Sequence, residues 1–209
     1  MTDLMSYVSR GGVVMIAILI CSVIALAVFL QRLWALRADN VLPEDARQRA
    51  LEALRRQDYV AAASAAGPET SFGRLLRAAL ADRELDEEAL RRELEEVGRR
   101  ELSNMERFTG LLGTLATITP LLGLLGTIIG MILTFRGVQE TAASSGVTAG
   151  AMADGIWQAL LTTAAGLIVA IPCFLAHRYI LARVDRWALL LEEVTGRVVR
   201  LLYGKGERP

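Results

Sequence analysis

Residues 108–135 read FTGLLGTLATITPLLGLLGTIIGMILTF, and residues 155–176 read GIWQALLTTAAGLIVAIPCFLA, with no charged side chain in either run. A helix that crosses a bilayer needs about 20 apolar residues, because the hydrocarbon core is about 30 Å thick. A third uncharged run, GGVVMIAILICSVIALAVFL, occupies residues 11–30. The three runs predict three transmembrane helices in an all-α integral membrane protein.

The first run has a competing interpretation as a cleaved signal peptide. Ala25-Leu26-Ala27 matches the small-x-small pattern of a cleavage site. This triplet lies inside the run, however, and residues 28–30 carry the apolar stretch onward. The preceding segment has only Arg10 as a positive side chain. We therefore interpret the run as a retained membrane anchor.

Residues 38–107 differ from the three runs because they are dense in Arg and Glu. Their apolar residues recur with a period near 3.6, which predicts helices. One helix is expected to begin at Pro43 and another after Asp86, with a turn at Gly67-Pro68. The amphipathic tail, residues 177–209, is expected to extend the third span as a helix.

Composition and chemistry exclude several classes of protein. Hydrophobic residues make up 53% of the 209 residues, and the formal net charge is zero, so nothing indicates a nucleic-acid partner. Cys21 and Cys173 lie inside apolar runs and are interpreted as small packing residues. His177, beside Arg178, is interpreted as an interfacial histidine rather than a ligand or proton relay. We find no nucleophile–base pair, metal-ligand spacing or phosphate loop, and expect no enzyme, metal or cofactor.

The distribution of basic residues predicts the orientation in the membrane. All Arg and Lys residues except Arg10 and Arg136 lie in residues 31–107 or in the tail. Loops rich in Arg and Lys stay in the cytoplasm. The N-terminus is therefore expected to face outward, and the charged region and the C-terminus to be cytoplasmic.

The predicted layout has six segments. They are residues 1–37, with the outer N-terminus and first transmembrane helix; 38–107, a cytoplasmic helical region; 108–135, the second transmembrane helix; 136–154, an outer linker; 155–176, the third transmembrane helix; and 177–209, a cytoplasmic C-terminal helix and tail.

The second and third spans are rich in small and polar residues, whereas the first is aliphatic. Helices of this composition pack against protein rather than lipid, and Gly126-x-x-x-Gly130 permits close approach of another backbone. Pro120 and Pro172 each break a backbone hydrogen bond at membrane depth, which requires a protein or water neighbour. These features fit either plain helix packing or a water-lined path.

Neither span contains an Asp, Glu, Lys, Arg or His before its end. A proton path through a membrane normally uses an ionisable group. A titrating group for such a path must therefore come from another chain, or from Asp154 at the outer mouth.

The segments TPLLGLLGTIIGMILTFRGV (119–138) and GIWQALLTTAAGLIVAIP (155–172) resemble the second and third spans of the ExbB, TolQ and MotA family of proton channels. Their order and short separation make the resemblance specific. The three-span plan with a central cytoplasmic insertion is similar to the ExbB and TolQ branch.

The resemblance implies a mechanism and a set of partners. Five subunits would surround the transmembrane helices of two ExbD/TolR-like chains in the lipid of a bacterial inner membrane, where the outer side is the periplasm. An aspartate on those chains would carry protons, and their flow would drive relative rotation that pulls on a TonB/TolA-like envelope protein.

The resemblance also implies roles for individual residues. Family pore threonines correspond to Thr127 and Thr163. A glutamate of enterobacterial relatives is replaced here by Gln158, which puts a proton-binding role at that position in doubt. We expect the pore lining to comprise Thr127, Thr163, Gln158, Thr162 and Thr134. We expect helix packing to involve Gly123, Gly126, Gly130, Pro120, Gly166 and Pro172.

Two alternatives stay open at this point. The chain could serve another duty in the same class, such as a TolQ-like envelope-constriction motor or a gliding or uptake motor. It could instead be a non-conducting membrane scaffold organised by its cytoplasmic helices.

Overall fold

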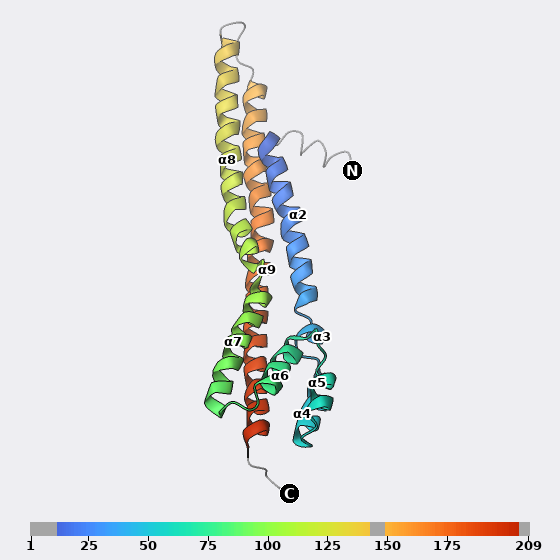
Figure 1. Ribbon diagram of the computed structural model, residues 1–209. Helices are drawn as coiled ribbons and strands as arrows, with labels where there is room; N and C mark the ends of the chain where they lie inside the picture. Colours follow the sequence, from blue (N-terminus) through green and yellow to red (C-terminus); the bar gives the residue numbers. More distant parts are fainter. Residues whose placement is uncertain (1–11, 143–148, 205–209) are drawn as a thin grey trace. The chain divides into compact units, whose positions relative to one another are not determined.

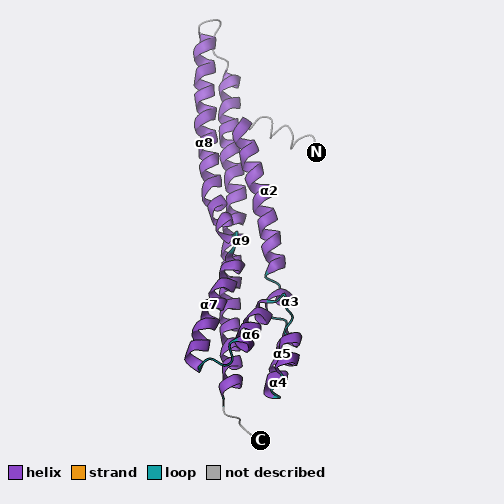
Figure 2. Ribbon diagram, in the orientation of Figure 1, coloured by secondary structure: helices purple, strands orange, loops and turns teal. Residues whose placement is uncertain are grey.

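A computed structural model of the chain describes residues 12–142 and 149–204, which form helices and connecting turns (Figure 1). No strand occurs among these residues (Figure 2). The chain divides into two compact units. We call residues 12–30, 108–142 and 149–178 the membrane unit, and residues 31–107 and 179–204 the charged unit.

Among the described residues, three helices are long and apolar enough to cross a membrane, which confirms the predicted all-α membrane class. They are α2 (Gly12–Ala35), α8 (Thr109–Ala142) and α9 (Ala149–Tyr203). Helix α8 continues past the uncharged run that ends at Phe135, and α9 begins before the run that starts at Gly155. The expected linker therefore contributes residues to both helices, and residues 143–148 lie outside the described part.

Helix α2 is apolar on all sides, but only one of its faces packs against the rest of the membrane unit. Val14, Met15, Ile18 and Ala25 are buried, whereas Ile20, among others, is more than half exposed. The buried positions recur at helical spacing, so a single stripe of α2 packs against protein. The remaining aliphatic side chains suit contact with lipid.

The charged unit contains five helices of its own and the end of α9. These helices are α3 (Ala38–Val41), α4 (Glu44–Arg55), α5 (Tyr59–Ala65), α6 (Ser71–Ala81) and α7 (Glu87–Glu106). Three begin at a side-chain cap: Asp58, Thr70 and Asp86 each accept a hydrogen bond from a backbone N–H three residues later. Such caps satisfy amides that have no partner within the helix.

The core of the charged unit is apolar, with an ion pair at its edge. Its most deeply buried side chains include Leu36, Phe72, Leu76, Leu90, Val184, Val194 and Val199. Glu101 of α7 is only 6% exposed and accepts two hydrogen bonds from Arg74 of α6, at 2.7 and 2.6 Å. This bidentate contact raises the pKa of Arg74 above its ordinary value, and it neutralises a carboxylate that would be costly to bury alone.

Long side chains cap the carbonyls at helix ends in the same unit. Arg183 Nε and Trp187 Nε1 of α9 each donate to the Leu36 carbonyl at 3.0 Å. Arg32 donates to the carbonyls of Asn104 and Met105, in the last turn of α7. A cation at a helix C-terminus also compensates the partial negative charge there.

Candidate functional site: the α8–α9 seam

Helices α8 and α9 pack antiparallel through small residues, and we call this contact surface the α8–α9 seam. The residues in contact are Thr109 and Gly113 with His177, Thr119 with Gly166, Gly123 with Thr163 and Gly166, Gly126 with Thr162, Gly130 with Ala159, and Thr134 with Gly155. Position numbers rise on one helix as they fall on the other, so the pairing keeps one register along both spans.

The glycines of the seam allow the two backbones to approach closely. A Cβ atom at Gly126 would lie 2.7 Å from the Cβ of Thr162, and one at Gly130 would lie 3.0 Å from the Cβ of Ala159. A Cβ atom at Gly166 would lie 2.9 Å from the backbone oxygen of Thr119. These distances leave no room for a side chain, so the seam depends on glycine at these positions.

Two of the threonines expected to line a pore lie inside the seam of the single chain. Thr162 is 1% exposed and Thr134 is 9% exposed. Their hydroxyls donate to carbonyls of their own helices, Thr162 to Ala159 and Thr134 to Gly130, both at 2.8 Å. A hydroxyl bonded in this way needs no partner from another helix.

Thr163 and Thr127 lie at the edge of the seam and are both partly exposed. The Thr163 hydroxyl donates across the seam to the Gly123 carbonyl at 3.1 Å, and the Thr127 hydroxyl donates to the Leu124 carbonyl at 2.7 Å. Gly123 and Thr127 are one turn apart on α8, so the two threonines lie on neighbouring turns of the helix pair.

Gln158 lies on a different side of α9, next to the start of α2. A Cβ atom at Gly12 would lie 3.5 Å from Gln158 Nε2. Five residues separate Gln158 from Thr163, which places their side chains about 140° apart around the α9 axis. Gln158 therefore faces α2, whereas Thr163 lies on another side of α9 and faces α8.

The two prolines lie inside continuous helices. Pro120 lies within α8 and Pro172 within α9. Each lacks an N–H, so the carbonyls of Ala116 and Ile168, four residues earlier, lose their usual helical donor.

Sequence reasoning did not anticipate the contact made by His177. Its Nδ1 lies 2.9 Å from the carbonyl oxygen of Thr109, in the first turn of α8. The Thr109 side chain is 1% exposed, and its hydroxyl has no hydrogen-bond partner in the structure. The available signal was a lone histidine at the end of an apolar run, which did not specify a partner.

The apolar runs carry no charge in the described part of the chain, and Asp154 is exposed near the beginning of α9. Within the described ranges, no three His, Cys, Asp or Glu side chains gather closely enough to hold a metal ion.

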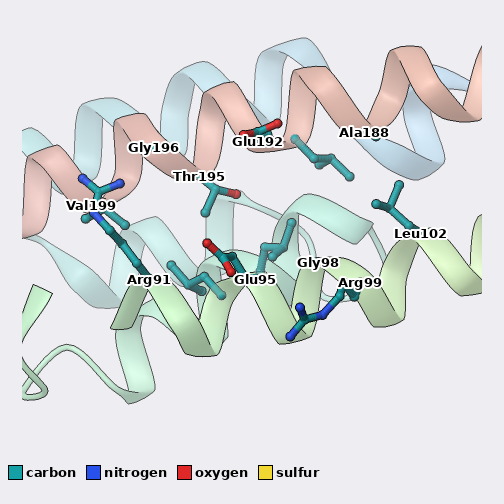
Figure 3. A pocket seen from close by; sticks show the side chains of 13 residues that line it. Arg91, Glu95, Gly98, Arg99, Leu102, Ala188, Glu192, Thr195, Gly196 and Val199 are labelled. Atoms are coloured by element: carbon teal, nitrogen blue, oxygen red, sulfur yellow. The ribbon is translucent and has the colours of Figure 1, made fainter. Parts of the chain in front are cut away.

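A groove of the charged unit lies between α7 and α9 (Figure 3). Its volume is about 420 Å³, and Gly98 and Gly196 widen it because neither carries a side chain. Leu75, Leu94 and Val199 contribute an apolar floor. None of the residues singled out from the sequence lines this groove, so we assign the candidate site to the seam.

Comparison with known proteins identifies relatives of the chain. Residues 68–193 match the model of the MotA/TolQ/ExbB proton channel family. The chain is 35% identical over 178 residues to the biopolymer transport protein ExbB-like 1 of Synechocystis, covering 83% of this chain and 68% of that protein. It is 40% identical over 94 residues to exbB1 of Vibrio cholerae, covering 45% and 40%.

A relative from the other named branch is the Tol-Pal system protein TolQ of Haemophilus influenzae. It is 31% identical over 110 residues, covering 51% of this chain and 47% of that protein. The chain thus spans about two thirds of the Synechocystis protein and less than half of the other two.

Proposed function

Because the chain belongs to the MotA/TolQ/ExbB proton channel family, we propose that it is the channel-forming subunit of a proton-driven motor in a bacterial inner membrane. Such a motor would energise an envelope process, for which outer-membrane transport is the first candidate. The observation that carries the proposal is the uncharged α8–α9 seam with Thr163 and Thr127 at its edge.

The proposed ion path runs along the face of α8 and α9 that carries Thr127 and Thr163. Gln158 faces Gly12 of α2, on another side of α9, and this supports a place for α2 on the outside of the assembly. A threonine hydroxyl donates one hydrogen bond and accepts others, so it can orient water or a carboxylate. Thr162 and Thr134 would support this path by packing rather than by direct contact.

The absence of an acid from the apolar runs supports a partner chain as the source of the titrating group, with Asp154 at the outer mouth as the alternative. We propose an ExbD/TolR-like single-span protein with a membrane aspartate as that partner, inside a homo-oligomer of five copies. A TonB/TolA-like envelope protein would receive the work. The basic residues of the charged unit support a cytoplasmic location for it, with the N-terminus and the α8–α9 connection in the periplasm.

The test is to replace the edge threonines by valine, which has nearly the same shape but no hydroxyl. Intramembrane hydrogen bonds average only about 0.6 kcal/mol, so Thr163→Val and Thr127→Val should assemble normally. We expect both variants to lose at least tenfold of motor-dependent work, because an unsolvated charge at mid-membrane is costly. Activity and complex recovery are measured on the same cells.

Thr114→Val is the matched control. Thr114 is exposed, and its hydroxyl donates to the Gly110 carbonyl of the same helix at 3.0 Å. We expect this variant to work and assemble like the wild type. Full activity of both edge variants would remove the threonines from the ion path.

A second candidate function is favoured by the similarity of this chain to a Tol-Pal system protein. The motor would then drive constriction of the cell envelope rather than transport. Co-purification in mild detergent, with mass determination of the complex, would identify the copy number and the partner and so separate the two duties.

A further inference from the structure

A second pocket of the charged unit lies where the chain leaves one apolar run and approaches the next. Its volume is about 380 Å³. The end of α2 lines it from Gln31 onward, directly after the apolar run of residues 11–30. Asn104 and Met105, in the last turn of α7, line it shortly before the run of residues 108–135. The connection to both runs therefore places this pocket at a membrane surface.

A buried cation, Arg32, lies in the wall of the pocket. Arg32 is 6% exposed, and its Nη1 donates to the carbonyls of Asn104 and Met105 at 3.3 and 3.4 Å. A guanidinium carries five N–H donors in a planar fork that matches the oxygens of a phosphate. Arg32 can therefore bind a phosphate oxygen in the pocket while its Nη1 keeps the contacts with α7.

The acidic part of the lining lies farther from the apolar runs. Glu101 lines the pocket one helical turn before Met105, about 6 Å along the axis of α7, and its bidentate contact with Arg74 neutralises it. Glu69 is the other carboxylate of the lining, and it is exposed. Its backbone carbonyl, rather than its side chain, accepts a hydrogen bond from Arg74 Nη1 at 2.7 Å. The pocket thus offers a carboxylate to a ligand beside the Arg74–Glu101 pair.

The charges of the lining cancel, because Arg32 and Arg74 are matched by Glu69 and Glu101. The charged residues that adjoin the lining along α2, α3 and α7 are all exposed, and they are Arg37, Asp39, Glu106 and Arg107. Helix α9 adds Arg183, which donates to the Leu36 carbonyl. A ligand with separated positive and negative charges therefore complements this pocket better than a purely anionic ligand.

Trp34 indicates that the ligand comes from the bilayer rather than from solution. This residue is 66% exposed at the end of α2, beside Arg32 in the lining. Asn40 Nδ2 donates to the Trp34 carbonyl at 2.9 Å and so ties α3 to the end of α2. Exposed tryptophans concentrate at the level of the lipid headgroups. Basic pockets at this depth are typical headgroup sites.

We propose that this pocket binds the headgroup of a phosphatidylethanolamine molecule of the surrounding bilayer, with its phosphate at Arg32 and its ammonium at Glu69. In this lipid the phosphate lies nearer to the acyl chains than the ammonium does, and Arg32 lies nearer to the apolar runs than the Arg74–Glu101 pair does. A primary ammonium donates hydrogen bonds to a carboxylate, whereas the choline group has no N–H. The inference goes beyond the proposed motor and does not depend on proton flow.

The first test compares lipids that differ only in the headgroup. Native mass spectrometry of the full-length protein in mild detergent measures the binding of phosphatidylethanolamine, phosphatidylcholine and phosphatidylglycerol with identical acyl chains. We expect the ethanolamine lipid to bind about tenfold more tightly than the choline lipid, a ratio that one hydrogen bond to a charged group supports. Equal binding of the three lipids, or tightest binding of phosphatidylglycerol, would overturn the proposal. Displacement of the lipid by an equal concentration of soluble glycerophosphoethanolamine would also overturn it.

Glu69→Gln tests the ammonium position, because Glu69 is exposed and its side chain can change without disturbing the Arg74–Glu101 pair. We expect the preference for ethanolamine over choline to disappear, while binding of the choline lipid is unchanged. Glu69→Lys should instead favour phosphatidylglycerol. Glu52→Gln is the matched control, since Glu52 is exposed on α4 and does not line the pocket. A wild-type preference in Glu69→Gln would reject the proposed site.

Arg32→Gln tests the phosphate position. We expect weaker binding of all three lipids, by about tenfold, because the charged donor to the phosphate is lost. Arg32 also bonds to the carbonyls of α7, so helix content and elution volume are checked first. Wild-type lipid binding by a folded Arg32→Gln protein would contradict the proposal. If this variant does not fold, the lipid comparison and Glu69→Gln still decide.

Discussion

At the scale of single residues, Gln57 occupies a backbone conformation that usually belongs to glycine. Its φ is 59°, and it directly follows Arg56, the C-terminal capping residue of α4. The N–H of Gln57 bonds to the Leu54 carbonyl and that of Asp58 to the Ala53 carbonyl, which is the Schellman arrangement at a helix C-terminus. The turn from α4 to α5 therefore contains a residue whose Cβ atom makes this backbone conformation sterically unfavourable.

Replacing this residue tests the penalty directly. The left-handed conformation costs a residue with a side chain about 1–2 kcal/mol. The greater freedom of glycine in the unfolded chain removes roughly 0.5–1 kcal/mol of the gain. We expect Gln57→Gly to raise the free energy of unfolding by about 0.5–1 kcal/mol, measured as local protection from hydrogen exchange in α4 and α5.

Gln57→Ala serves as the control, because alanine keeps the Cβ atom that causes the strain. This variant should show no gain in protection. Equal gains from both substitutions would point to loss of the glutamine side chain rather than relief of the backbone.

At the scale of helices, the α8–α9 seam is the contact on which the candidate site depends. We expect Gly126→Leu to abolish recovery of the assembled complex, because even a Cβ atom at this position would lie 2.7 Å from the Thr162 Cβ. Gly110→Leu is the matched control on the same helix, since a Cβ atom there meets nothing within 4 Å. Size-exclusion chromatography in mild detergent measures the recovery, and wild-type yield from Gly126→Leu would argue against close packing.

Periodicity and composition predicted the helices but not how they face one another. The three spans, the helix after Asp86 and the turn at Gly67-Pro68 follow from local patterns of charge, apolar spacing and turn residues. The rotation of α9 about its own axis does not follow from local patterns, because it is set by contacts between segments that are distant in sequence. Nothing local in the sequence indicates that Gln158 faces Gly12 or that Thr162 lies inside the seam.

At the scale of the whole molecule, charge and hydropathy are sorted into separate parts. The membrane unit carries the three uncharged runs, and the charged unit carries the Arg-rich and Glu-rich helices. This sorting could be predicted from the sequence, because each run is long enough to be recognised by itself. The continuation of α9 from one unit into the other could also be predicted, because the amphipathic pattern from residue 177 onward indicates that the third span extends as a helix into the tail.

The orientation proposed from this sorting is open to chemical labelling. A single cysteine at Ala63, on α5, should react only with a reagent that enters the cytoplasm. A single cysteine at Ser144, outside the described residues, should react with an impermeant reagent applied from the periplasm. Both experiments need Cys21 and Cys173 replaced by alanine as background. The reverse pattern of labelling would invert the proposed topology.

The hydrogen bonds of the membrane threonines also bear on how the protein enters the bilayer. The hydroxyls of Thr114, Thr117, Thr119, Thr127, Thr134 and Thr162 all donate to carbonyls within their own helices. Thr163 differs, because its hydroxyl donates to Gly123 on the other helix. A hydroxyl that is bonded within its own helix needs no partner from another helix. Among these threonines, therefore, only Thr163 has to wait for the α8–α9 hairpin to close before its hydroxyl finds the acceptor seen here.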